Sequence, residues 1–183
     1  MIRSLILLKI TFIISSFLFC QDIEALFNQA NSKLKVGKLK SAESLLQQAL
    51  DIDPSFAPAR VGFSELWLRR GDLVKANEYA TMAVRIDKDF RSWWDDLNEI
   101  RSKIQKGRMS IQKGDYDTAM QEYQTVAKEY PYFPEAQYFM GLTKFRQKDF
   151  EGAAFYFNEA LNLYPDHEKS QKGLNNVKKQ FRK

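Results

Sequence analysis

The chain has 183 residues, of which 44% are apolar and 28% charged, so its composition is that of one globular domain and not of a disordered chain. Its 8 Gly and 5 Pro are few, and the prolines stand between the periodic segments, which favours an all-α fold. The formal net charge is only +5, and the densest basic run is the tail from Lys178 to Lys183. This distribution argues against a nucleic-acid binder, which would need a broad basic face.

Residues 1–20 have the pattern of an export signal. Arg3 gives a positive start, and the uninterrupted apolar run from Ile10 to Phe19 is about half as long as a membrane-spanning helix. The sequence therefore predicts a cleaved signal peptide. The alternative is an uncleaved anchor that associates the protein with a membrane through its N-terminus.

The end of this signal leaves two outcomes open. Cys20, the single cysteine, stands where a bacterial lipoprotein carries its acylated cysteine, but the preceding Phe19 is larger than the small residue of that motif. Cleavage after Cys20 is thus expected, with Gln21 as the new N-terminus, while lipidation of Cys20 stays open. Both outcomes predict a periplasmic protein or one associated with the bacterial cell envelope.

Beyond the leader, one sequence pattern recurs at a fixed interval. The step from Ala42 to Ala76 equals the step from Ala119 to Ala153. This period of 34 is typical of a helix-turn-helix repeat. The domain at 21–183 divides into four repeats and a capping helix: 23–56, 57–90, 100–133, 134–167 and 168–183. Within each repeat the helices break at Gly37, Gly71, Gly114 or Lys148, and glycine supplies a left-handed helix cap.

The repeats resemble the tetratricopeptide repeat family, whose pattern has a small residue at the eighth position and Ala at the twentieth. The eighth positions here are Ala30, Ser64, Gly107 and Gly141. The twentieth positions are Ala42, Ala76, Ala119 and Ala153. The Trp that the family carries at the fourth position is absent from all four repeats. The resemblance implies a right-handed α-solenoid of four helix-turn-helix repeats that acts as a non-catalytic interaction module.

One interval breaks the period, because the step from Ala76 to Ala119 is longer than the repeat by nine positions. The added residues contain no Gly or Pro, so the sequence predicts one extended helix at about 91–113, roughly 13 Å longer than a regular one. Trp93 belongs to an apolar stripe that is expected to pack on the second repeat. Trp94 cannot share that face and is a candidate anchor for a partner; the alternative is that the whole added segment packs internally.

The resemblance also implies a concave groove that the first helix of each repeat lines. The fifth and twelfth positions of these helices are apolar: Phe27, Val61, Ile104, Tyr138, Leu34, Leu68, Ile111 and Phe145. The ninth and thirteenth positions add polar and basic candidates: Asn31, Arg108, Arg69 and Arg146. An apolar floor with a basic rim suits a peptide with apolar anchors and acidic residues. The alternative is that the apolar positions pack as core.

The sequence carries no recognisable catalytic set. His167, the single histidine, stands in a turn and is expected at the surface, and zinc would require three or four convergent ligands. No nucleophile and base pair can be built from one His and one Cys so far apart, and Gly-rich phosphate loops are absent. We therefore expect no enzymatic activity, no bound metal and no cofactor.

Together these features predict a non-catalytic scaffold for a peptide or protein partner in the bacterial cell envelope. Two alternatives stay open, a lipid-anchored structural component and an accessory subunit of an envelope assembly or secretion complex. Self-association through the repeat ends and the Trp94 segment also stays open.

Overall fold

The computed structural model describes residues 22–182, which form nine α-helices and a short 3₁₀ turn, with no strand in that range. The first helix spans residues 22–35. The others are α2 (Leu39–Ile52), α3 (Ala57–Arg69), α4 (Leu73–Ile86), η1 (Lys88–Phe90), α5 (Arg91–Lys113), α6 (Tyr116–Glu129), α7 (Pro134–Arg146), α8 (Phe150–Leu163) and α9 (Glu168–Gln180). This arrangement of paired helices confirms the predicted all-α solenoid, including the extended helix at 91–113. The predicted signal peptide and Cys20 lie outside the described residues.

Each helix pair turns at a residue with left-handed backbone. Gly37, Gly71 and Gly114 have φ of 71°, 79° and 79°, and Lys148 has φ of 63° without being glycine. In the last three turns an Asp follows and caps the next helix; for example, the Asp115 carboxylate accepts from the Thr118 backbone N–H at 3.1 Å. A left-handed residue ends one helix and an Asp N-cap begins the next, so the chain reverses within a few residues.

Small side chains let the paired helices approach closely. The alanines at the four twentieth positions are fully buried. Gly107 of α5 faces the Tyr123 ring of α6, and a Cβ on Gly107 would lie 2.5 Å from ring atoms. Gly141 of α7 is placed in the same way against Phe157 of α8. The eighth position of these repeats is therefore small because the aromatic ring at the twenty-fourth position occupies the space beside it.

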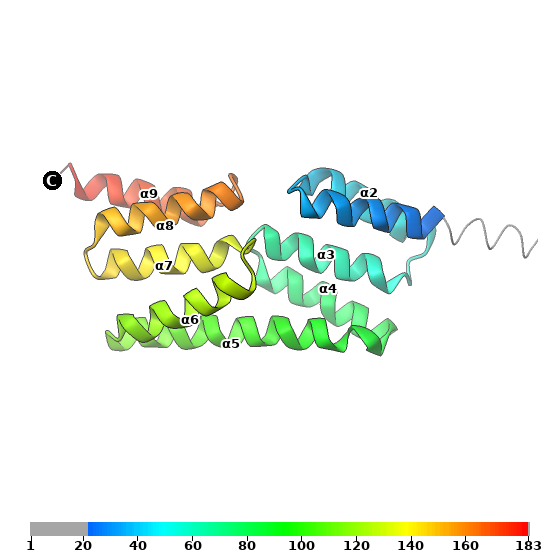
Figure 1. Cartoon of the computed structure of the whole chain (residues 1–183), viewed down its shortest axis with the longest axis horizontal. Coiled ribbons are helices and arrows are strands. Elements are labelled where there is room, and N and C mark those ends of the chain that lie inside the picture. Colours follow the sequence, from blue (N-terminus) through cyan, green and yellow to red (C-terminus); the bar gives the residue numbers. More distant parts are fainter. Residues whose placement is uncertain (1–21, 183) are drawn as a thin grey trace, which may run out of the picture.

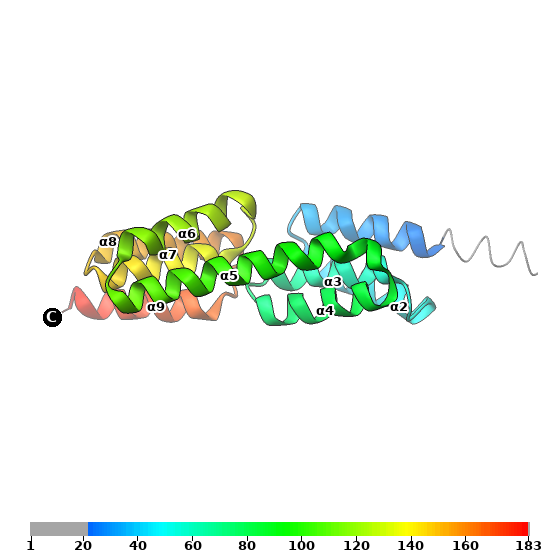
Figure 2. The same cartoon turned by 90° about the horizontal axis from the view of Figure 1, so that it is seen from below.

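The long helix α5 divides the solenoid into two halves, an N-terminal half at residues 22–86 and a C-terminal half at residues 116–182. Figures 1 and 2 show α5 running along both halves, and in Figure 1 α3 and α7 lie roughly in line instead of side by side. The first part of α5 packs on α4 and the last part on α6. Because nine extra residues add roughly 13 Å of helix, the second pair of repeats is displaced along α5.

The two halves nevertheless share a core. A single apolar cluster extends from Leu68 of α3 through Ile100 and Ile104 of α5 to Tyr123 and Phe139. At its edge, the Arg69 guanidinium lies 4.0 Å from the centre of the Tyr132 ring, which precedes α7. Burial raises the pKa of Tyr132 to about 12, because its phenol is largely removed from water. The end of α3 is thus packed against the start of α7.

The last helix, α9, closes the C-terminal half. Val177 is buried and Leu174 half-buried in a cluster with Ala153 and Phe157 of α8. A solenoid needs such a helix because its last repeat otherwise exposes an apolar face. Within the described range, no helix combines the length and the apolar character that crossing a membrane requires.

Candidate functional site

The added segment of α5 is held on the N-terminal half by its two tryptophans. The Trp93 Nε1–H donates to Ser64 Oγ at 2.9 Å, and the Trp94 Nε1–H donates to Thr81 Oγ1 at 3.0 Å. Both indoles are half-buried, and the Arg91 guanidinium lies 4.6 Å from the centre of the Trp94 ring. The expectation of an exposed Trp94 anchor is therefore corrected: the segment packs internally, because both indole N–H groups find hydroxyl acceptors on the second repeat.

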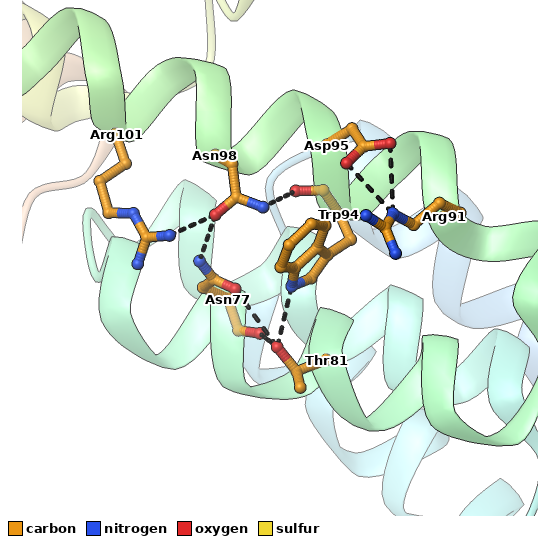
Figure 3. A network of polar contacts seen from close by, with 7 residues as sticks. All are labelled: Asn77, Thr81, Arg91, Trp94, Asp95, Asn98 and Arg101. Carbon is orange, nitrogen blue, oxygen red and sulfur yellow. Dashed lines mark hydrogen bonds and ion pairs between the residues drawn. The ribbon is translucent and has the colours of Figure 1, made fainter.

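A polar network continues this contact along α4 and α5 (Figure 3). Asn98 Nδ2 donates to the Trp94 carbonyl at 2.9 Å, and Asn98 Oδ1 accepts from Asn77 Nδ2 at 3.3 Å and from the Arg101 guanidinium. Thr81 Oγ1 in turn donates to the Asn77 carbonyl at 2.8 Å. These bonds fix α5 against α4 and hold Arg101 at the edge of the contact.

A groove of ≈ 1060 Å³ opens beside this network, where the two halves meet. It is lined by α4, α5, the start of α7, the α3–α4 turn and the α8–α9 turn. Its apolar lining includes Phe139 and the buried Ile104. On the α4 side, Val74 and Met82 are 70% and 42% exposed. An apolar edge therefore stays open to solvent along α4.

The α5 wall of the groove is basic. Arg101 and Arg108 are exposed there, and Arg85 of α4 also lines the groove. None of the ion pairs among residues 22–182 includes these three guanidinium groups. Unbalanced positive charge at a partly apolar surface attracts carboxylates and selects against basic partners.

The acidic residues of the lining are mostly engaged within the protein. Asp72 caps α4 by accepting from the Lys75 N–H at 3.0 Å, and the Glu168 carboxylate pairs with Lys172 at 3.3 Å. Glu135 is buried against His167 and Lys169. Glu78 and Asp166 take part in none of the ion pairs among residues 22–182. Glu78 is exposed on α4 between Val74 and Met82, and Asp166 lies in the α8–α9 turn. The groove therefore has a basic wall along α5 and carboxylates on α4 and at the α8–α9 turn.

His167 closes one end of the groove and corrects the expectation of a surface residue. Its side chain is only 5% exposed, with Nε2 3.0 Å from Glu135 Oε2 and Nδ1 2.8 Å from Ser170 Oγ. A Cβ on Gly71 would lie 2.8 Å from His167 Nε2, so the α8–α9 turn also contacts the α3–α4 turn. Sequence position alone could not show this, since the burying residues come from three other segments.

A series of hydrogen bonds links Ser170 to His167 and His167 to Glu135. It has the connectivity of a catalytic triad of nucleophile, base and acid, but not the accessibility of one. Ser170 is fully buried, so its hydroxyl has no access to a substrate. The three side chains satisfy one another's hydrogen bonds and fasten the α8–α9 turn to α7. Across the described residues, no group of three or more His, Cys, Asp and Glu side chains is arranged to hold a metal ion.

Most of the predicted concave-groove residues pack within the protein. Leu34, Leu68 and Ile104 are buried, and for them the core alternative describes the structure. Half-buried aromatic side chains have ring partners: Phe27 with Phe56 at 5.8 Å, Tyr138 with Phe157 at 5.8 Å and Phe145 with Phe150 at 5.4 Å. Val61, Ile111 and Asn31 are half-buried, and Arg146 is exposed. The Arg69 guanidinium pairs with Glu65 at 2.8 Å.

The groove between the halves brings together only Ile104 and Arg108 of the predicted set. Its other main contributors, Val74, Met82 and Arg101, were missed. Val74 and Met82 lie on α4, a second helix of its repeat, and the family pattern places binding on the first helices. A sequence signal existed, since Val74, Met82 and Ile86 recur at helical spacing on the face away from Ala76 and Ala80.

Among solved structures, the TPR domain of P58(IPK) matches with a TM-score of 0.65 and 17% identity, covering 87% of this chain and 46% of that one. The TPR2AB domain of yeast Sti1 in complex with pHSP90 has a TM-score of 0.43 at 16% identity, covering 87% and 71%. The pilF protein of Pseudomonas aeruginosa has a TM-score of 0.41 at 20% identity, covering 90% and 71%. The chain thus spans less than half of the P58(IPK) domain, and the likeness concerns the fold. No curated protein matches the chain.

Family models support the repeat assignment directly. Three models, each described as tetratricopeptide repeat, match residues 33–96, 104–131 and 134–167. The two gaps between them are short, and the first falls within α5. The matches therefore extend over most of the described helices, and the chain belongs to the tetratricopeptide repeat family.

Proposed function

We propose that the protein is a non-catalytic interaction scaffold whose groove between α4 and α5 binds an amphipathic segment of another protein. The observation that carries this proposal is the exposed Val74 and Met82 of α4 beside Arg101 and Arg108 of α5, whose guanidinium groups form no ion pair among residues 22–182. Solenoids of repeats characteristically present extended surfaces of this kind to their partners.

The spacing of the side chains defines the segment that fits. Val74 and Met82 are eight residues apart on one face of α4, which separates them by about 12 Å. Arg101 and Arg108 are seven residues apart on one face of α5, or roughly 10 Å. A helix of two to three turns with apolar residues seven or eight apart would place them on Val74 and Met82, with an acidic flank towards Arg101 and Arg108.

Photo-crosslinking tests the groove. A benzophenone amino acid replaces Met82 in the groove in one variant and the exposed Phe155 of α8 in a matched control. The proposal expects the Met82 variant, expressed in cells, to crosslink a protein segment with apolar residues at helical spacing and a net negative charge. Addition of Arg101→Glu and Arg108→Glu should abolish that crosslink without changing the circular dichroism spectrum.

The control position distinguishes specific binding in the groove from nonspecific binding to an exposed apolar side chain. Equal crosslinking of the same segment at Phe155 would contradict the proposal. So would a crosslink at Met82 that survives both charge reversals.

The proposed setting is the bacterial cell envelope, and it rests on the sequence of residues 1–20. The mass of the N-terminus of the protein purified from cells tests it. A chain that begins at Gln21 supports cleaved export, and an acylated Cys20 supports the lipid-anchored alternative. A chain that retains residues 1–20 in the soluble fraction would contradict both.

A further inference from the structure

The positive charge of the protein is concentrated at its C-terminal end. Residues 168–183 contain six Lys or Arg residues and one Glu, a net charge of +5, which equals the formal charge of the whole chain. All residues before position 168 are therefore neutral in sum. Such separation of charge predicts a local electrostatic attraction that the modest total charge conceals.

The turn between α7 and α8 adds to this charge. The turn and the end of α9 lie at the same end of the molecule in both views (Figures 1 and 2). Their contact is aromatic, with the Phe150 and Phe181 ring centres 6.2 Å apart. We call Arg146, Lys148, Lys178, Lys179 and Arg182 the terminal basic surface; all five are exposed.

The charges of the terminal basic surface are not neutralised by ion pairs among residues 22–182. The nearby Asp149 is engaged elsewhere, since its carboxylate pairs with Lys144 at 3.1 Å and accepts from the Gly152 N–H at 2.9 Å. One exposed carboxylate, Glu151, lies in the first turn of α8, so the five cations leave this end with a net positive charge.

Lys148 provides a second observation. It adopts φ of 63°, the conformation that glycine adopts in the other three repeats. A residue with a Cβ is disfavoured there, so the turn carries its lysine at some cost in backbone strain. At this turn the side chain adds a cation beside Arg146.

An aromatic ring lies among these cations. Phe181 is 62% exposed although it contacts Phe150. Basic residues around an exposed aromatic ring are the combination that binds anionic bilayers, because the cations attract the headgroups and the ring enters the interface. Nucleic acids are instead bound by elements that enter a groove or by concave basic channels, whereas the terminal basic surface consists of the α7–α8 turn and the C-terminal end of α9.

We infer that the terminal basic surface docks on an anionic phospholipid membrane, with the ring of Phe181 at the level of the headgroups. This interaction is independent of the groove between α4 and α5.

Vesicle co-sedimentation tests the inference. Residues 21–183, which contain every helix of the described structure, are mixed with vesicles of two parts phosphatidylcholine to one part phosphatidylglycerol, or of phosphatidylcholine alone. Binding is expected to the anionic vesicles only and to weaken as salt rises. The triple variant Lys178→Gln, Lys179→Gln, Arg182→Gln should bind about a hundredfold more weakly, at about fivefold per charge.

The controls keep the result specific. Lys35→Gln, Lys38→Gln, Lys40→Gln removes the same charge from exposed positions of the first repeat and should leave binding within about twofold. Phe181→Ser should weaken binding at all salt concentrations. Equal loss in both triple variants, equal binding to neutral vesicles, or tighter binding to a short DNA duplex at the same salt would each overturn the inference.

Discussion

At the scale of single residues, one ion pair ties the first two repeats together. The Arg70 guanidinium donates two hydrogen bonds to the Glu43 carboxylate, at 3.0 and 2.6 Å. Arg70 is largely buried, whereas the Glu43 side chain is 39% exposed, so solvent screens part of this interaction. The hydrogen bonds from Arg70 lower the pKa of Glu43 below its ordinary value of 4.5.

This pair makes stability depend on pH in a defined direction. A carboxylate with a lowered pKa stabilises the fold above its ordinary pKa, and the contribution is lost as pH falls through the lowered value. Glu43→Gln should therefore reduce the free energy of unfolding by about 0.5–1 kcal/mol at pH 7 and by much less at an acid pH well below the ordinary pKa of 4.5, where the carboxyl group of folded Glu43 is also protonated. Urea unfolding at both pH values measures it.

Glu168→Gln is the matched control. Glu168 forms an i,i+4 pair in which both side chains are more than three-quarters exposed, so little change is expected. A Glu43 effect that is the same at both pH values would contradict the assigned role of its charge.

At the scale of elements, α5 depends on its first turns being anchored. Trp93 and Trp94 each donate one indole hydrogen bond to the second repeat. Trp93→Phe or Trp94→Phe keeps most of the ring but removes the donor, and each should cost about 1 kcal/mol of stability. Amide hydrogen exchange should accelerate in residues 91–99 and remain unchanged in residues 104–113, which pack on α6. Equal acceleration along the whole helix would contradict separate anchoring of its two parts.

The bounds of α5 were predictable from the sequence, whereas the use of its faces was not. The nine residues added to the repeat contain no Gly or Pro, so they predict a longer helix and not a loop. The structure confirms this prediction, since α5 spans Arg91–Lys113. Whether the Trp94 side chain packs internally or projects into solvent depends on a hydrogen-bond acceptor from another helix, the hydroxyl group of Thr81 on α4. The groove between α4 and α5 could not be predicted for a related reason. It forms where the two halves are displaced along α5, and the sequence pattern of a single repeat does not contain that displacement.

At the scale of the whole molecule, the relative placement of the halves depends on a close contact at Gly71. A Cβ there would lie 2.8 Å from His167 Nε2 and 3.3 Å from Pro134 Cγ. Gly37 and Gly114 share its left-handed backbone, yet a Cβ on either meets nothing within 4 Å. Substitution of the three glycines therefore distinguishes the cost of backbone strain, which all three share, from the cost of disturbing the contact between the halves, which only Gly71 makes.

Alanine at these positions makes that separation measurable. Gly37→Ala and Gly114→Ala should each cost about 1 kcal/mol, the penalty of a side chain at positive φ. Gly71→Ala should cost about 1–3 kcal/mol more, because the methyl group pushes the buried His167 and Pro134 away. Denaturant unfolding of the three variants gives the comparison, and equal losses would mean that the halves do not constrain each other through Gly71.

The nine residues added to α5 also have a consequence for its helical phase. An α-helix turns by about 100° per residue, so nine residues rotate it by about 900°, which is two full turns and one half turn. Nine added residues alone would thus leave the next pair of repeats half a turn out of phase along α5. The α5 side chains that face the shared core nevertheless keep one face of the helix, because they follow one another in steps of three or four residues: Trp93, Leu97, Ile100, Ile104, Gly107 and Ile111. Both halves therefore pack on the same face of α5, one behind the other along its axis.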